Sequence, residues 1–128
     1  MKVPILLSKS HSIYFLRLMV SGSMIAHAVA RLYLGTVGGF GEFLNSFGLQ
    51  IGVAIAWGVT LFELLGGVFM LFNYATRWIS MVWMVELVTG ILLVHLNQGW
   101  FVVGAGTGGM EYSVILIVAL LVIQAHSD

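Results

Sequence analysis

The side chains able to do chemistry in this chain are polar or ionisable groups set within long apolar runs. One group lies toward the same end of these runs and comprises His27, Arg31, His95, Asn97 and Glu111. Histidine exchanges protons near neutral pH, and arginine, asparagine and histidine all donate hydrogen bonds. Such a set can bind a headgroup with carbonyl oxygens, such as a quinone, and a bound quinol would need a proton acceptor. We interpret the five residues as a possible quinone site, with His95 and Glu111 as candidate catalytic residues.

A bis-histidine haem is a second use for the histidines of this group. His27 and His95 would be its axial ligands, but their estimated depths in the membrane differ by about 6 Å. The sequence therefore does not favour haem as a cofactor.

A second group of ionisable residues lies deeper. Such a side chain costs about 2.5–3.5 kcal/mol on insertion scales, so it usually faces a bundle interior. At about 1.5 Å per residue, Glu63 lies about 13 Å and Arg17 about 7 Å from the inner ends of their runs, the ends near Lys9 and Arg77. Arg17 can reach the carboxylate, so we expect Arg17 and Glu63 to form a structural polar core. A functional role for this pair is an equally good interpretation.

Helical phase, at about 100° per residue, indicates which of these side chains share a face. Arg17, His27 and Arg31 fall within an arc of about 80°, so one helix face serves both groups. Glu86 and His95 are nine residues apart and would point in opposite directions. Glu86 would then pack on a different neighbouring helix or face another subunit, which makes it a possible partner contact.

The composition identifies the solvent around these groups. The chain has 128 residues, 60% hydrophobic and 8% charged, with a mean hydropathy of +1.06. Soluble domains carry roughly 25% charged residues, so lipid is the expected surrounding. This excludes a soluble enzyme, a disordered regulator and a nucleic-acid binder.

The chain has no cysteine, which excludes thiolate metal sites and iron–sulfur clusters, and we expect no bound metal.

Four apolar segments are candidate membrane spans, at residues 12–34, 51–72, 78–96 and 110–125. A span needs about 20 apolar residues, so the fourth is short. The runs lack the period-two alternation of membrane barrels, whereas helices satisfy their own backbone polar groups in lipid. The sequence predicts an all-α fold, an integral membrane four-helix transmembrane bundle, in a single domain over residues 1–128.

Basic residues are distributed unevenly about these spans. Lys2 and Lys9 precede the first span and Arg77 lies between the second and third, whereas the loops at 35–50 and 98–110 contain neither Lys nor Arg. The positive-inside rule then predicts that both termini are cytoplasmic. The glycines of the two loops indicate flexible or re-entrant segments.

Small residues recur at every fourth position of the first span, at Gly22, Ala26 and Ala30. Such spacing lets helices approach closely in lipid. It fits a dimer face or, as we favour, packing within the chain's own bundle.

Several segments, in order, resemble the DoxX family of small prokaryotic membrane proteins. They are Arg17 at the opening of the first span, then SGSMIAHAVARL, FELLGGVFMLF, ATRW, VHLNQGWF and GGMEYSVIL. The resemblance covers residues 16–123. Two positions depart from the family pattern: Glu86 stands where a small or apolar residue is expected, and Arg31 stands where Lys is commoner.

This resemblance implies a four-helix transmembrane bundle in the prokaryotic inner (plasma) membrane. The family takes its name from a subunit of an archaeal terminal quinol oxidase, related to thiosulfate:quinone oxidoreductase. The implied function is a subunit of a quinone-linked oxidoreductase or respiratory complex, acting with other membrane subunits or by self-association. The alternatives are a non-catalytic accessory or assembly subunit and a small proton or solute conduit.

Overall fold

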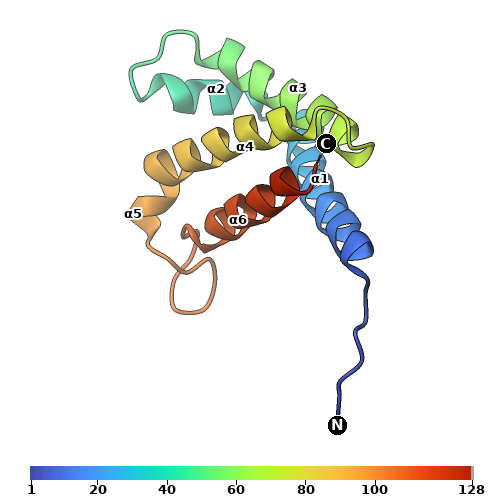
Figure 1. The fold of residues 1–128 in the computed structure, drawn as a ribbon. Helices are drawn as coiled ribbons and strands as arrows, with labels where there is room; N and C mark the ends of the chain where they lie inside the picture. Colours follow the sequence, from blue (N-terminus) through green and yellow to red (C-terminus); the bar gives the residue numbers. More distant parts are fainter. Residues whose placement is uncertain (128) are drawn as a thin grey trace. The chain divides into compact units, whose positions relative to one another are not determined.

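The computed structural model describes residues 1–127, which form helices and contain no strand (Figure 1). Three stretches are long and apolar enough to cross a membrane: Lys9–Leu34, Gly52–Leu71 and Thr76–Gln98. A fourth apolar helix, Glu111–Ala125, has 15 residues, which at about 1.5 Å each fall short of a bilayer core of about 30 Å. The all-α membrane class is confirmed. Within the described residues, three helices have spanning length and the fourth is shorter.

The described residues divide into two compact units. The unit Ser21–Tyr74 is called the hairpin unit below, and residues 1–20 with 75–127 are called the terminal unit. Helix α1 (Lys9–Leu34) contributes to both. The single domain expected over residues 1–128 stays a prediction.

The hairpin unit is built on two helices that follow α1. Helix α2 (Val37–Asn45) folds back along α3 (Gly52–Leu71), and the two lie side by side in Figure 1. The buried positions of α2 are Val37, Gly41 and Leu44, whose spacing places them on one face. A Cβ atom on Gly41 would lie 2.5 Å from the Cα of Val53, so glycine permits the contact. The segment 35–50, expected as a loop, therefore contains a packed helix.

Helix α1 packs against α3 at Ile25 within the hairpin unit. A Cβ atom on Gly67 would lie 2.4 Å from a side-chain carbon of Ile25, which marks the close approach of the two helices. Gly22, Ala26 and Ala30 are exposed, and a Cβ atom on Gly22 would meet nothing within 4 Å. Within the hairpin unit Gly67 of α3 therefore faces Ile25, and the packing of the Gly22, Ala26 and Ala30 row within the chain's own bundle stays a prediction.

The terminal unit pairs the third apolar stretch with the last helix. Helix α4 (Thr76–Gly90), the π-helical segment η1 (Ile91–His95) and α5 (Leu96–Gln98) follow one another without a break. Helix α6 (Glu111–Ala125) packs along α4. The buried positions are Thr76, Ile79, Ser80 and Trp83 on α4 and Ser113, Leu116, Leu120 and Ile123 on α6.

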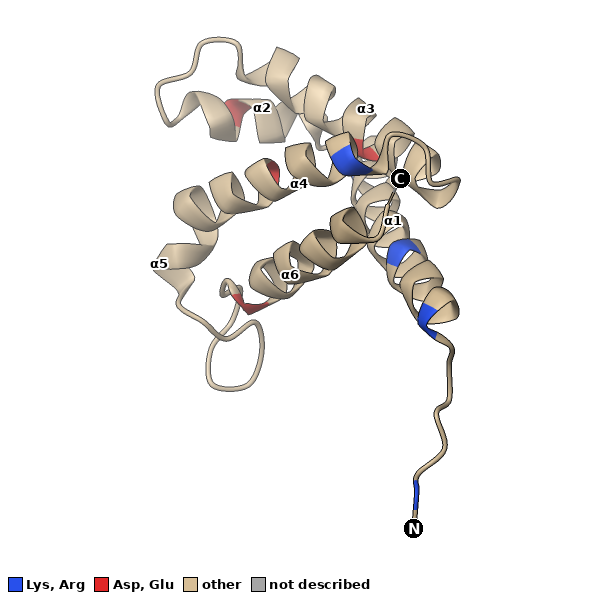
Figure 2. Ribbon diagram, viewed as in Figure 1, with Lys and Arg blue, Asp and Glu red and all other residues tan. Residues whose placement is uncertain are grey.

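Polar side chains are buried in this fold while many large apolar ones are exposed. On α3, Thr60 is fully buried and Glu63 is 4% exposed, whereas Leu61 and Leu65 are 46% and 54% exposed. Charged residues are sparse along the helices (Figure 2). This distribution suits a chain whose outer surface contacts lipid and whose few charges need partners.

Candidate functional site

Arg31 lies at the centre of the polar contacts of the hairpin unit. Its Nη2 donates a hydrogen bond to Glu63 Oε2 at 2.7 Å, within a salt bridge, and its Nη1 donates to Thr60 Oγ1 at 2.9 Å. Its guanidinium carbon lies 5.2 Å from the centre of the Phe40 ring. One side chain of α1 thus joins α3 and the α2 helix.

The partner of Glu63 differs from the one that depth along the helices favours. Depth in the membrane, counted in residues from the helix ends, places Arg17 near Glu63. This count assumes that the ends of the helices lie at the same depth. Because α2 folds back along α3, the end of α1 lies beside the middle of α3, where Thr60 and Glu63 are three residues apart on the buried face. Arg31, which we expected in the quinone site, is therefore the partner of Glu63.

The Arg31 network is nearly closed to its surroundings. The side chains of Arg31 and Glu63 are 20% and 5% exposed. A buried charge is tolerated when it is paired and its remaining hydrogen-bonding groups are satisfied, and the Thr60 hydroxyl and the Phe40 ring contribute to that here. The arrangement supports a structural role for this network.

Arg17 belongs to the terminal unit. Its guanidinium carbon lies 5.8 Å from the centre of the Tyr14 ring. Its Nε is buried with no hydrogen-bond partner among the described residues. The membership of Arg17 in a polar core with Glu63 stays a prediction.

The π-helical segment changes the direction in which His95 points. A π turn contains about one residue more than an α turn, so the residues that follow it lag by about 100°. Around the helix axis, Glu86 and His95 then lie about 80° apart instead of about 180°. His95 comes to lie on the same side of the helix as the buried Thr76. The argument that Glu86 and His95 point in opposite directions is therefore wrong, because it assumes an unbroken α-helix. Both residues are half-buried.

His95 is held by the loop that follows it. Its Nδ1 lies 2.8 Å from the carbonyl oxygen of Gly108. Because a carbonyl oxygen can only accept, Nδ1 carries the hydrogen and donates it. In the neutral ring Nε2 is then the basic nitrogen, free to accept a hydrogen bond or a proton from a ligand.

Backbone hydrogen bonds close this loop onto the start of α6. The backbone N–H of Gly109 donates to Phe101 O at 3.0 Å, and that of Glu111 donates to Trp100 O at 3.0 Å. A Cβ atom on Gly109 would lie 2.4 Å from the carbonyl carbon of Trp100, so this close approach requires glycine. Glu111 Oε2 accepts a longer bond, 3.4 Å, from the N–H of Val102. His95 and Glu111 thus both contact one loop.

The other members of the proposed quinone site are distributed over both units. Asn97 is exposed on α5 of the terminal unit, while His27 is exposed on α1 of the hairpin unit. The gathering of all five residues around one ligand stays a prediction. Within the described residues, no group of three or more His, Asp or Glu side chains is placed to hold a metal ion.

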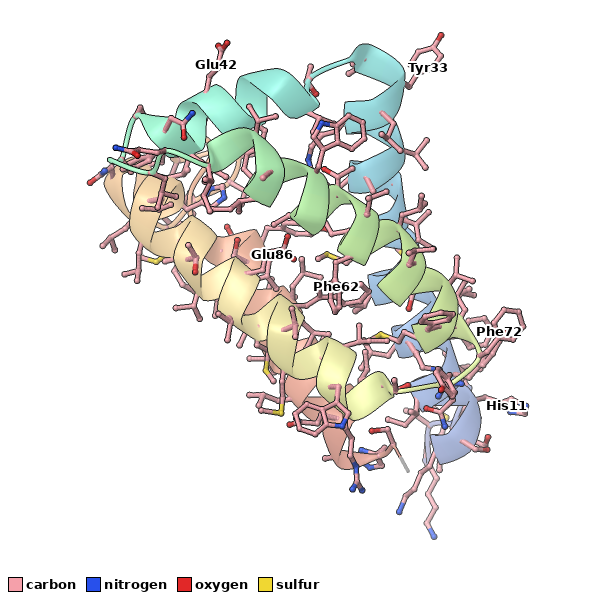
Figure 3. The ribbon with its side chains drawn as sticks, turned by 90° about the horizontal axis from the view of Figure 1, so that it is seen from above. His11, Tyr33, Glu42, Phe62, Phe72 and Glu86 are labelled. Carbon is pink, nitrogen blue, oxygen red and sulfur yellow. The ribbon has the colours of Figure 1, made fainter. Side chains whose placement is uncertain are left out.

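Two further charged residues lie outside these clusters. Glu86 is half-buried on α4, and Glu42 is exposed on α2, where Figure 3 shows it pointing away from the helix. The role of Glu86 as a partner contact stays a prediction.

The structure adds residues that the sequence did not single out. Thr60 lies three positions before Glu63, so helical spacing places both on one face and could have identified it. The Gly108 carbonyl has no such signal, because its position depends on the path of the loop.

The family model for DoxX matches residues 12–96, more than half of the chain. No curated protein and no solved structure matches the chain. The match contains Arg31, Glu63 and His95, and it ends before Glu111. With its apolar spanning helices, the chain is a multi-pass membrane protein that belongs to the DoxX family.

Proposed function

We propose that this chain is a subunit of a quinone-linked membrane oxidoreductase, and that it binds the quinone headgroup beside His95 and Glu111. The observation that carries the proposal is the hydrogen bond from His95 Nδ1 to the Gly108 carbonyl. It fixes one ring nitrogen as a donor to the protein and leaves the other for a ligand.

The residues present fit such a ligand. His95 Nε2 can accept the hydrogen bond of a hydroxyl group, and the protonated ring can donate to a carbonyl oxygen. Glu111 lies at the other end of the same loop and offers a second proton acceptor. A bound quinone would supply two-electron, two-proton redox chemistry. In the proposed site Asn97 would add a hydrogen-bond donor at its edge.

Two substitutions of His95 separate ligand binding from loop support. His95→Asn retains a donor near the position of Nδ1 and removes Nε2, whereas His95→Gln retains a polar group near Nε2 and removes the Nδ1 bond. We expect His95→Asn to weaken binding of a labelled quinone analogue by about tenfold or more, because it removes one charge-assisted or well-placed hydrogen bond to the ligand. Unchanged binding in a folded His95→Asn protein would contradict the proposal.

A non-catalytic accessory or assembly subunit is the second candidate. The observation in its favour is the Arg31 network, whose charged groups pair with each other within the chain. In this case Glu86 would contact a partner subunit. Glu86→Leu should then reduce the amount of partner that co-purifies, while quinone binding by the His95→Asn protein stays normal.

We also propose that the chain lies in a prokaryotic plasma membrane with both termini cytoplasmic. The uneven distribution of Lys2, Lys9 and Arg77 supports this orientation. Because the chain has no cysteine, Ser8→Cys and Ala105→Cys each introduce a single thiol. An impermeant thiol reagent should label intact cells at position 105 and not at position 8, and the reverse result would contradict the orientation.

A further inference from the structure

A groove opens in the terminal unit at the end where α4 begins and α6 ends. It has a volume of about 700 Å³ and is lined by Arg77, Trp78, Met81, Leu121, Gln124 and Ala125. We propose that this groove binds one anionic phospholipid, with the phosphate at Arg77 and an acyl chain along Trp78, Met81 and Leu121.

The charge of the groove favours an anion. Among the described residues that line the groove, Arg77 is the one ionisable residue and none is acidic. Arg77 Nε donates to the carbonyl oxygen of Ser127 at 3.0 Å, and Gln124 Nε2 donates to the Arg77 carbonyl oxygen at 3.4 Å. These bonds hold the arginine at the groove. The terminal guanidinium nitrogens carry four further N–H donors, in a geometry that matches phosphate oxygens.

The rest of the lining favours a chain attached to that anion. Trp78, Met81 and Leu121 are 72%, 48% and 50% exposed, so their apolar surfaces are open to lipid. Tryptophan is enriched where the headgroups meet the hydrocarbon of a bilayer. Ala125 also lines the groove, and its small side chain fills little of the space. A free phosphate ion would use the arginine and leave this apolar surface without a partner.

The proposed lipid site is independent of the proposed quinone site. None of its lining residues belongs to the His95 loop, and none is a histidine or a carboxylate that could exchange a proton with a quinol. The groove instead suits a ligand with a permanent negative charge.

The test uses the full chain in phosphatidylcholine vesicles and quenching of its fluorescence by brominated phosphatidylglycerol. Trp78→Phe identifies the part of the signal that comes from Trp78. We expect brominated phosphatidylglycerol to quench Trp78 at a lower mole fraction than brominated phosphatidylcholine. Arg77→Gln should raise by about fivefold the mole fraction of brominated phosphatidylglycerol at which half of the Trp78 fluorescence is quenched. This is the contribution to binding that one basic residue usually makes near an anionic surface.

Matched variants separate charge, space and folding. Arg77→Lys should retain most of the preference for phosphatidylglycerol over phosphatidylcholine, because it keeps the positive charge. Ala125→Phe should reduce this preference by filling the groove. Lys9→Gln should leave it unchanged. The proposal is overturned if Arg77→Gln behaves as the unaltered chain, or if the two brominated lipids quench equally. It is also overturned if inorganic phosphate abolishes the quenching, since the anion alone would then be the ligand.

Discussion

Arg31 in the hairpin unit and His95 in the terminal unit are both ionisable side chains on helices of membrane-spanning length, but they have different partners. Arg31 meets a carboxylate, a hydroxyl and an aromatic ring, and its charge is compensated within the chain. His95 meets a single backbone carbonyl, which orients the ring and leaves Nε2 available. The first arrangement is suited to holding helices together, and the second to meeting a ligand.

The partners of Arg31 and His95 differ because a charged group and a neutral group need different compensation in a low-dielectric environment. A guanidinium stays charged, so in a low-dielectric environment it must have a counter-charge. A neutral imidazole needs only its donor satisfied, and it can stay half-buried with its acceptor unused. The two regions should therefore respond in opposite ways to substitution. The Arg31 network should govern stability, and the His95 loop should govern binding.

The largest effect is expected at Glu63. Glu63→Ala leaves Arg31 with a buried and unpaired charge, which should lower the free energy of unfolding by about 3–5 kcal/mol. Titration with a denaturing detergent, followed by circular dichroism, would measure this loss. The control is the double variant Arg31→Met, Glu63→Leu, which removes both charges and should recover most of the stability. A small loss in Glu63→Ala would show that the ion pair does not hold the unit together.

A smaller effect is expected at Thr60. Thr60→Val retains the shape of the side chain and removes the acceptor for Arg31 Nη1, which should cost about 1.5–3 kcal/mol for a hydrogen bond to a charged group. The same detergent titration measures it. Combined with Glu63→Ala the two losses should not add, because both act through Arg31. Additive losses would contradict a single network.

The apolar segments of this chain could be predicted from sequence because lipid imposes about 20 apolar residues on each span. Helices α1 and α3 and the stretch Thr76–Gln98 accordingly lie close to the expected ranges. The shortness of the fourth segment is also predictable from its apolar length, and helix α6 has 15 residues. Composition alone was sufficient for these features.

The pairings were not predictable, because they depend on where helix ends lie. Helix α2 lies in a glycine-rich segment that composition marks as a loop, yet its packing along α3 brings Arg31 level with Glu63. The π segment has no compositional signal either, since its hydrogen-bond register is set by the surrounding structure. Phase and depth calculated from ideal helices were therefore misleading at Glu86, His95 and Arg31.

The smallest effect on stability is expected at His95, whose substitution tests whether the two regions have different roles. His95→Asn retains a donor for the Gly108 carbonyl, so the free energy of unfolding should fall by no more than about 1 kcal/mol, the usual contribution of a neutral hydrogen bond. The same protein should show the large loss of quinone-analogue binding proposed above. A loss of stability as large as that of Glu63→Ala would show instead that His95 closes the terminal unit as Arg31 closes the hairpin unit. The half-buried ring would then be a structural residue, and the available Nε2 would carry no argument for a ligand.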